Sequence, residues 1–231
     1  MNGPTQDEKR RILEEHYLLG KLSSSEIDHL LNYARVETYP AGQEIYAKGS
    51  PGQSMFAVLR GAAKMSSVSS EGKEIVLNII YEGDIFGEIA LLDGKERSAD
   101  AVAMIDCQVL VFNRRDVLPV LERHADICLM LIRILCERLR RTSAQVEDVL
   151  FRHLEARIAK ALLELAQHTS GPGGRGAPLD LHLSQRDLGN LVGSTRESVN
   201  KQLQIWQRAG LIDVAKGTIM IRNAAAIQQL V

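Results

Sequence analysis

The sequence predicts an α+β protein in which a β-roll of the jelly-roll type precedes a long helix and a winged helix-turn-helix. Between residues 36 and 113, short apolar runs alternate with eight glycines, a pattern typical of closely spaced strands and tight turns. Residues 120–170 then contain neither Gly nor Pro, which leaves room for more than one helix. Two short helical segments and a hairpin pattern complete the C-terminal part.

The composition is that of an ordinary globular chain, with 45% hydrophobic and 25% charged residues over 231 positions. No apolar run reaches membrane-spanning length and the N-terminus is polar, so we expect a cytoplasmic protein without a membrane partner. The three cysteines form an odd number with no metal-type spacing. We therefore expect buried thiols and no metal.

Charge is distributed unevenly along the chain. Residues 151–231 carry ten Lys/Arg and six Asp/Glu, a net charge of +4, whereas the remainder carries 18 against 23, a net charge of −5. A basic C-terminal part on an acidic body indicates where a nucleic acid would bind. On its own this is a weak signal, because such a charge over a domain of this length is common.

The first elements follow in order. Residues 7–34 have a helical pattern, with a helix start near 22–26, and strands are expected at 56–59, 75–80 and 109–112, with a turn at 69–72. None of the six histidines falls in the β region. A jelly-roll metalloenzyme needs a His/Glu ligand cluster on its strands, so this enzyme class lacks its residues. No other catalytic constellation is present, and we do not expect an enzyme.

Segment 86–99 places two charged residues, Glu88 and Arg97, inside apolar, Gly-punctuated sequence. Such charges are rarely buried unless something pairs with them. Backbone at Gly87 can approach a ligand closely, an Arg suits a phosphate and a Glu suits a sugar hydroxyl. This combination favours a small phosphorylated sugar, such as a nucleotide. The alternative is a buried Glu–Arg ion pair with a structural role, and spacing alone leaves both interpretations open.

Two overlapping apolar stripes run along the first half of the long helical region with the 4-3-4-3 spacing of a coiled-coil seam. They comprise Ile132, Cys136, Leu139, Ser143, Val146 and Leu150, and Leu135, Leu139, Thr142, Val146 and Val149. One stripe suffices for packing on the β domain, so the second indicates pairing with another copy of the chain. Thr142 and Ser143 place hydroxyls in this seam, where backbone carbonyls or a ligand can bond them.

The C-terminal part begins at a junction near 151–154, followed by a helix at 154–167 and a loop at 171–178 that is flexible by composition. Ser184-Gln185-Arg186-Asp187 is a capping-box pattern that opens a helix, with a core face at Leu188, Leu191 and Val192. Gly193-Ser194 forms a tight turn and Thr195 caps the next helix, which Val199 and Leu203 anchor. These offsets predict a helix-turn-helix.

The second of these helices exposes Arg196, Glu197, Asn200 and Lys201 near its start. A recognition helix reads base edges in the major groove with residues at these places. The alternative is a solvated charged face. Segments 211–213 and 218–221 flank Lys216-Gly217 as a short hairpin, the wing of a winged helix.

With both ends in view, residues 20–222 resemble the cyclic AMP receptor protein (CRP/FNR) family of bacterial transcription regulators. Gly-Glu, a short helix and then Arg-Ser resemble the phosphate-binding cassette of cyclic-nucleotide-binding domains. The resemblance implies a homodimeric regulator that binds palindromic double-stranded DNA, contacts RNA polymerase and is activated by a cyclic nucleotide. Cyclic AMP is favoured and cyclic GMP remains possible. Iron–sulfur members need an N-terminal Cys cluster, and this chain has no Cys before Cys107.

The resemblance also assigns residues. Glu88 would bind the ribose 2′-hydroxyl, Arg97 with Ser98 the cyclic phosphate, and Thr142 with Ser143 of a partner chain the base. The whole ligand set is Gly87, Glu88, Ile89, Arg97, Ser98, Thr142 and Ser143. The DNA set is Ser184, Gln185, Ser194, Thr195, Arg196, Glu197, Asn200, Lys201 and Lys216.

Two positions depart from the family pattern. Lys201 replaces the last Arg of the Arg-Glu-x-x-x-Arg motif and lacks its bidentate fork for guanine, and His153 replaces a helix-starting Asp. We expect domains at 1–123, 124–150 (the dimerisation helix) and 151–231. The alternative from another class is a constitutive DNA-binding regulator whose Glu/Arg pair is only structural.

Overall fold

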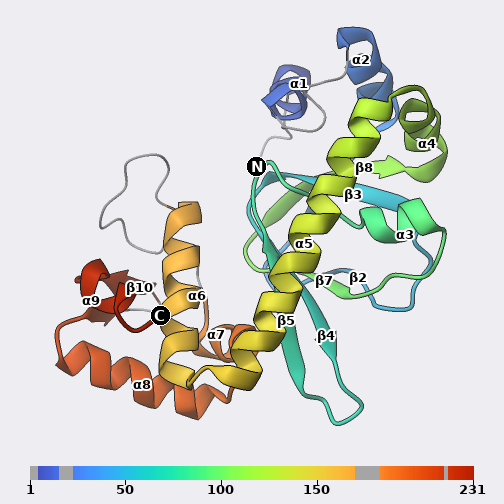
Figure 1. Cartoon of the computed structure of the whole chain (residues 1–231). Helices are drawn as coiled ribbons and strands as arrows, with labels where there is room; N and C mark the ends of the chain where they lie inside the picture. Colours follow the sequence, from blue (N-terminus) through green and yellow to red (C-terminus); the bar gives the residue numbers. More distant parts are fainter. Residues whose placement is uncertain (1–4, 16–22, 170–182, 216–217) are drawn as a thin grey trace. The chain divides into compact units, whose positions relative to one another are not determined.

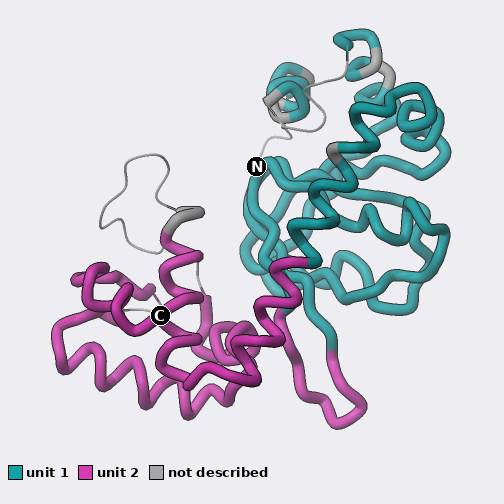
Figure 2. Tube along the Cα trace, viewed as in Figure 1, with its two compact units in different colours: residues 1–67, 77–139 teal, residues 68–76, 140–231 magenta. Residues whose placement is uncertain are grey.

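The computed structural model describes residues 5–15, 23–169, 183–215 and 218–231. Contacts divide the chain into two compact units, residues 1–67 with 77–139 and residues 68–76 with 140–231 (Figure 2). The loop expected at 171–178 and the wing tip Lys216-Gly217 lie outside the described residues. Each unit is considered in turn.

Two short helices open the first unit, α1 (Gln6–Glu15) and α2 (Ser24–Tyr33), in agreement with the helical pattern predicted for residues 7–34. The roll that follows consists of β1 (Arg35–Tyr39), β2 (Glu44–Tyr46), β3 (Ser54–Arg60), β4 (Ala63–Val68), β5 (Glu74–Ile80), β6 (Ile85–Phe86), β7 (Asp100–Ala103) and β8 (Cys107–Asn113). They form two four-stranded sheets, ordered β1-β8-β3-β6 and β2-β7-β4-β5 (Figure 1).

The three predicted strands fall within β3, β5 and β8, and the predicted turn at 69–72 joins β4 to β5. Two of the strands that were not predicted, β1 and β6, lack a long apolar run. β1 has only exposed and half-buried residues, and β6 has only two residues. Such segments become strands because a neighbouring strand supplies hydrogen bonds, as when β1 pairs antiparallel with β8 over five residues.

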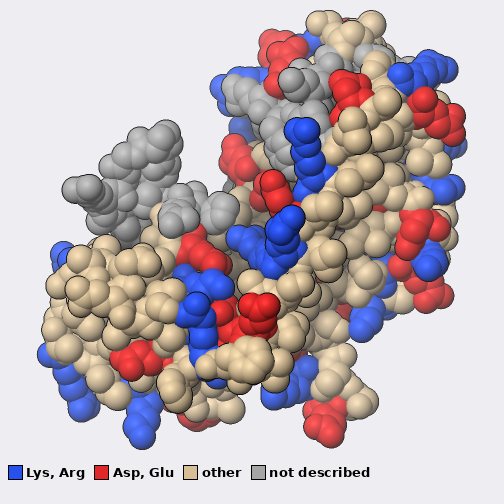
Figure 3. Space-filling model, in the orientation of Figure 1, with Lys and Arg blue, Asp and Glu red and all other residues tan. Residues whose placement is uncertain are grey.

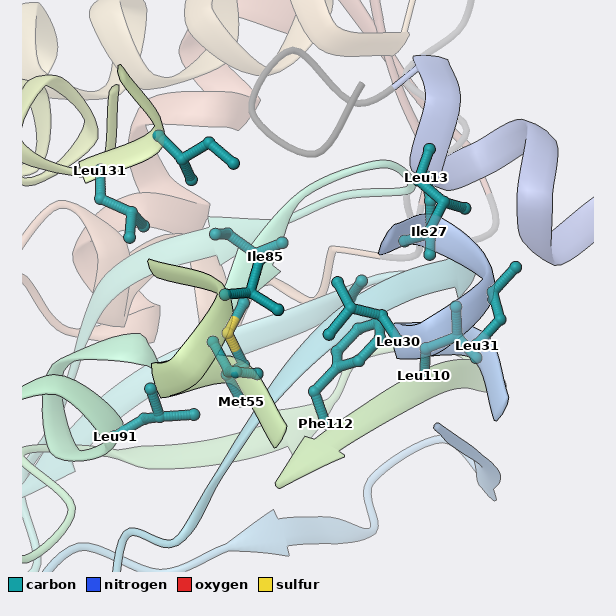
Figure 4. Packing of buried hydrophobic residues seen from close by; sticks show 14 of the residues in the cluster. Leu13, Ile27, Leu30, Leu31, Met55, Ile85, Leu91, Leu110, Phe112 and Leu131 are labelled. Atoms are coloured by element: carbon teal, nitrogen blue, oxygen red, sulfur yellow. The ribbon is translucent and has the colours of Figure 1, made fainter. Parts of the chain in front are cut away.

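One hydrophobic core joins the helices to the first sheet. Leu13 of α1 and Ile27 of α2 pack with Leu110 and Phe112 of β8 (Figure 4). A second cluster, between the two sheets, contains Phe56, Phe86 and Val109. Burying an aliphatic or aromatic side chain stabilises the fold by about 1.5–3 kcal/mol. These two clusters therefore hold the segment between β6 and β7, which carries Glu88 and Arg97, on a rigid support.

Three helices accompany the roll: α3 (Glu88–Asp93), α4 (Arg114–Arg123) and the long α5 (Ala125–Phe151). α5 faces the core with Ile127, Leu131 and Ile134. Its seam positions are exposed in the single chain, including Leu139 at 67% and Val146 at 55%. Residues 125–139 of α5 belong to the first unit and residues 140–151 to the second.

The second unit contains the predicted junction after Phe151, then α6 (Leu154–Thr169), α7 (Gln185–Leu191), α8 (Arg196–Arg208), β9 (Ile212–Ala215), β10 (Thr218–Ile221) and α9 (Ala224–Gln228). β9 and β10 pair antiparallel, as predicted for a wing. Trp206 of α8 is buried and donates a hydrogen bond from Nε1 to Glu155 Oε1 of α6 at 3.1 Å. This contact anchors the helix-turn-helix on α6.

The expectation of buried cysteines is correct for Cys107, whose thiol pKa is raised to about 11 by burial, and wrong for Cys136. Cys136 is exposed because it lies on the seam face of α5, which the single chain does not cover. Within the described residues, no helix is both long enough and apolar enough to cross a membrane.

Candidate functional site

Gly87 sets the geometry of the charged segment. It precedes α3 as its N-cap with a φ of 76°, in the left-handed region that favours glycine. A Cβ at this position would lie 2.8 Å from Arg97 Nη1 and 3.1 Å from Phe56 Cδ2. Both the backbone conformation and the available space therefore require glycine here.

Arg97 is buried, at 5% exposure, and forms no ion pair with a carboxylate of the described residues. Its Nη1 donates to the Gly87 carbonyl at 2.8 Å and its Nη2 to Ser54 Oγ at 3.0 Å. The guanidinium carbon lies 4.2 Å from the centre of the Tyr46 ring. Burial lowers the pKa of Arg97, and the nearby Tyr46 and Glu88 partly oppose this shift. The third guanidinium nitrogen, Nε, is buried without a hydrogen-bond partner among the described residues.

Glu88 is more deeply buried, at 1% exposure, and its partner comes from α5. Arg138 Nη1 forms an ion pair with Glu88 Oε1, and Arg138 Nη2 donates to the Ile85 carbonyl at 2.5 Å. The second carboxylate oxygen, Oε2, is buried without a hydrogen-bond partner among the described residues. Glu88 and Arg97 are both among these residues and form no ion pair with each other, unlike the pair that the structural alternative assumed.

With respect to the described residues, the segment thus presents a buried acceptor without a partner, Glu88 Oε2, and a buried donor nitrogen without one, Arg97 Nε. Buried polar atoms are nearly always hydrogen-bonded in folded proteins. A ligand that supplies a hydroxyl for the first atom and an anionic oxygen for the second would satisfy both. A phosphorylated sugar has these two groups.

The other predicted ligand residues are less enclosed. Ser98 is exposed, directly after Arg97, and Ile89 is 42% exposed at the start of α3. Thr142 and Ser143 are exposed on α5, about one helical turn beyond Arg138, and belong to the second unit. Within one chain, the structure brings Glu88 and Arg97 together with Gly87. The hydroxyls of Thr142 and Ser143 lie on the exposed seam of α5.

The predicted helix-turn-helix has the expected local bonds. Ser184 Oγ accepts from the Asp187 backbone N–H at 3.0 Å, and Thr195 Oγ1 accepts from that of Ser198 at 3.2 Å. Gly193 has a φ of 64° in the turn. Gly189 was not singled out from the sequence, but a Cβ there would lie 3.0 Å from the Ser194 carbonyl. The close approach of α7 to this turn therefore requires a small residue.

The side chains proposed to read DNA gather at the start of α8. Arg196, Glu197 and Lys201 are exposed and Asn200 is half-buried. Figure 3 shows Lys and Arg side chains along the lower edge, where Figure 1 places α8. Hydrogen bonds from its own backbone N–H and from Thr195 lower the pKa of Glu197. Of the other predicted residues, Thr195 and Ser184 are exposed, Gln185 and Ser194 are half-buried, and Lys216 lies outside the described residues.

Both the N-terminal and the C-terminal part of the chain match models of known protein families. Residues 36–124 match the model for the cyclic nucleotide-binding domain, and residues 156–230 match that for the Crp-like helix-turn-helix domain. The chain is similar to a protein of Thermus thermophilus named cyclic AMP receptor protein, at 31% identity over 90% of this chain and 94% of that protein. The chain belongs to the CRP/FNR family of transcription regulators.

Other CRP/FNR proteins extend the comparison. The CRP-like cAMP-activated global transcriptional regulator of Mycobacterium tuberculosis is 29% identical over 80% of this chain and 83% of its own length. Among solved structures, FixK2 from Bradyrhizobium japonicum has a TM-score of 0.77 at 24% identity, covering 85% of this chain and 96% of that chain. That likeness concerns the fold. It agrees with the α+β architecture of a β-roll followed by a helix-turn-helix.

Sequence reasoning missed three residues that surround the charged pair in this CRP/FNR protein: Tyr46, Ser54 and Arg138. Arg138 is one of several arginines on α5, so nothing in the local pattern distinguishes it from a solvated charge. Ser54 and Tyr46 lie on β3 and β2, more than 40 residues before Arg97. Only the closure of the roll brings them to the guanidinium.

Proposed function

We propose that this CRP/FNR regulator is a homodimer that a cyclic nucleotide, in the first instance cyclic AMP, converts to a DNA-binding form. The observation that carries the proposal is the pair of buried, unsatisfied atoms Glu88 Oε2 and Arg97 Nε. The ribose 2′-hydroxyl can donate to the first, and an oxygen of the cyclic phosphate can accept from the second. Charge-assisted bonds of this kind are among the stronger ones in proteins.

In this proposal, Glu88 binds both the ligand and a residue of α5. Glu88 accepts from Arg138 through Oε1 and would accept from the ribose through Oε2. A bound nucleotide would therefore act on the carboxylate that already connects the roll to α5. The conformational change is limited by the ligand's differential affinity for the two states of the protein.

The exposed seam of α5 supports the homodimer. Leu139, Val146 and Leu150 are between 55% and 67% exposed in the single chain, with the coiled-coil spacing noted above. Pairing of two seams would place Ser143 of the partner subunit beside Thr142, where both hydroxyls can bond the base. Two-fold symmetry would then be mirrored in a palindromic operator, with half-sites about one DNA turn apart. We place this DNA-bound activity, and its contact with RNA polymerase, in the cytoplasm.

A second candidate rests on the Glu88–Arg138 ion pair. Because Glu88 already has a partner, the charged segment can stabilise a constitutive DNA-binding regulator that needs no effector. Titration calorimetry of the purified protein with cyclic AMP, combined with operator binding with and without the nucleotide, separates the two. Heat of binding together with stronger operator binding supports the switch. Equal operator affinity without detectable nucleotide binding supports the constitutive form.

For the DNA surface, we expect Glu197→Ala to relax base preference at one pair of each half-site. The loss of discrimination should be about 1–3 kcal/mol, because an acidic side chain that accepts from cytosine is one of the direct base contacts. The measurement is competition between operator variants that differ at single base pairs. Exposed Gln207→Ala, near the other end of α8, is the matched control. Unchanged preference in Glu197→Ala at every base pair would contradict a reading role for this residue.

For the base, we expect cyclic AMP to induce operator binding at lower concentration than cyclic GMP. The two nucleotides share ribose and phosphate, so only groups near the base, here Thr142 and Ser143, can distinguish them. Thr142→Ala should reduce activation by cyclic AMP more than it reduces nucleotide binding, because the contacts at Glu88 and Arg97 remain.

Calorimetry and operator titration are to be performed separately for each nucleotide and variant, with Thr142→Ser as the variant that keeps the hydroxyl. Activation by cyclic GMP at lower concentration than by cyclic AMP would refute the assignment.

A further inference from the structure

We propose that Tyr46 is a positioning residue of the nucleotide site, whose aromatic face holds the Arg97 guanidinium ready for the cyclic phosphate. The inference rests on the proposed nucleotide function and adds a residue that the sequence pattern did not indicate. Tyr46 is the last residue of β2, in the sheet opposite Phe56 and Phe86.

The starting point is the buried cation Arg97, which has no ion-pair partner in the part of the chain that the structure describes. Both acceptors of Arg97, the Gly87 carbonyl and Ser54 Oγ, are neutral. Burying a charge without an opposite charge is unfavourable. Without further support, the side chain would gain hydration by turning outward. A guanidinium that turned outward would have to be reordered each time a ligand bound.

Tyr46 supplies that support through its ring. The guanidinium carbon is 4.2 Å from the Tyr46 ring centre and 5.4 Å from that of Phe56, both within the range of a cation–π interaction. Ring faces carry partial negative charge and attract the cation without neutralising it. The positive charge therefore stays available to an incoming phosphate.

The ring itself is fixed by its neighbours. The centre of the Tyr46 ring lies 5.5 Å from that of Phe56 and 6.1 Å from that of Phe86, and the two phenylalanine rings are stacked at 4.9 Å. Among the described residues, the Tyr46 hydroxyl donates to Met65 Sδ, a weak acceptor, at 4.0 Å. The aromatic face, rather than the hydroxyl, is the part of Tyr46 that acts on Arg97.

Together these contacts determine the plane of the guanidinium. Gly87 and Ser54 hold its two Nη atoms, Tyr46 covers one face, and Nε is left as the unsatisfied donor. A phosphate would meet a donor that is already oriented. Preorganisation of this kind raises affinity by reducing the ordering that binding would otherwise require.

The test measures cyclic AMP affinity by calorimetry for the wild type, Tyr46→Phe and Tyr46→Leu. Phenylalanine keeps the aromatic face and should bind within about twofold of wild type. Leucine removes it and should weaken binding about tenfold, the upper part of the range for a cation–π contact. Tyr39→Leu is the matched control, since Tyr39 packs against the same cluster, whereas the cation–π contacts of Arg97 are with Tyr46 and Phe56.

A second series separates this role from simple packing and does not depend on Tyr46→Leu folding well. Phenylalanine and its mono-, di- and trifluorinated analogues at position 46 have nearly the same shape, while fluorine progressively weakens the ring face. Affinity should fall stepwise with fluorination while the melting temperature stays constant. Equal affinity across the series, or loss of affinity only in parallel with melting temperature, would overturn the proposal.

Failure of this inference is distinguishable from failure of the proposed function. If the wild-type protein binds neither cyclic AMP nor cyclic GMP, the nucleotide function fails, and the positioning role fails with it. If the wild type binds and the fluorinated series is flat, the nucleotide function stands and Tyr46 has only a packing role.

Discussion

Replacing Arg97 with leucine is expected to abolish cyclic AMP binding while leaving the N-terminal unit folded. Arg97 supplies the positive charge proposed to bind the phosphate, and each hydrogen bond to a charged group contributes about 1.5–3 kcal/mol. Loss of the bond from Nε alone weakens binding by at least about tenfold, and loss of the positive charge that faces the phosphate adds to this. The fold should tolerate the change, because Arg97 is buried without an ion-pair partner among the described residues and leucine removes that charge.

The measurement combines calorimetry with thermal unfolding followed by circular dichroism. Arg115→Leu is the control, since Arg115 is 81% exposed and distant in sequence from the charged segment. Operator binding by Arg97→Leu should no longer respond to nucleotide. A variant that unfolds at a much lower temperature and yet, when folded, binds cyclic AMP normally would show that Arg97 is structural.

The opposite phenotype is expected for Arg138→Leu, which should lower the free energy of unfolding by about 3–5 kcal/mol. Arg138 is the ion-pair partner of Glu88, a carboxylate with only 1% exposure. Its removal leaves this buried carboxylate without the ion-pair partner that the structure shows for it. Arg138 also donates to the Ile85 carbonyl at 2.5 Å, so a second bond is lost with the same side chain.

Urea unfolding of wild type, Arg138→Leu and the double variant Glu88→Gln/Arg138→Leu provides the measurement. The double variant should recover part of the lost stability, because a neutral amide in place of the carboxylate no longer requires a cation. If Arg138→Leu is as stable as wild type, the ion pair contributes nothing and Glu88 must be compensated in another way.

These two experiments separate two buried charges that look equivalent in the sequence. Among the described residues, Glu88 has an ion-pair partner, whereas Arg97 has only neutral hydrogen-bond acceptors. If the charged segment has only a structural role, both Arg97 and Arg138 should matter for stability. The proposed nucleotide site predicts instead that Arg138 matters chiefly for stability and Arg97 chiefly for binding.

Local patterns were sufficient for much of the fold. The glycine-punctuated apolar runs predicted the roll, and the caps at Ser184 and Thr195 predicted both helices of the helix-turn-helix, with side-chain bonds to Asp187 N and Ser198 N. These features depend on contacts over three or four residues, which a sequence displays directly. The short strands β2 and β6 escaped prediction because their pairing depends on strands far along the chain.

By itself, the sequence determined the family, the order of the elements and the two charges of the candidate site. It did so because glycine spacing, helix caps and a cassette-like segment are local and specific to residue type. Only the tertiary structure decided that Glu88 pairs with Arg138, that the described partners of Arg97 are neutral, and that Tyr46 lies over the Arg97 guanidinium. Partner choice for a buried charge depends on which distant segments the roll and α5 bring within a few ångströms, and no spacing rule along the chain encodes that.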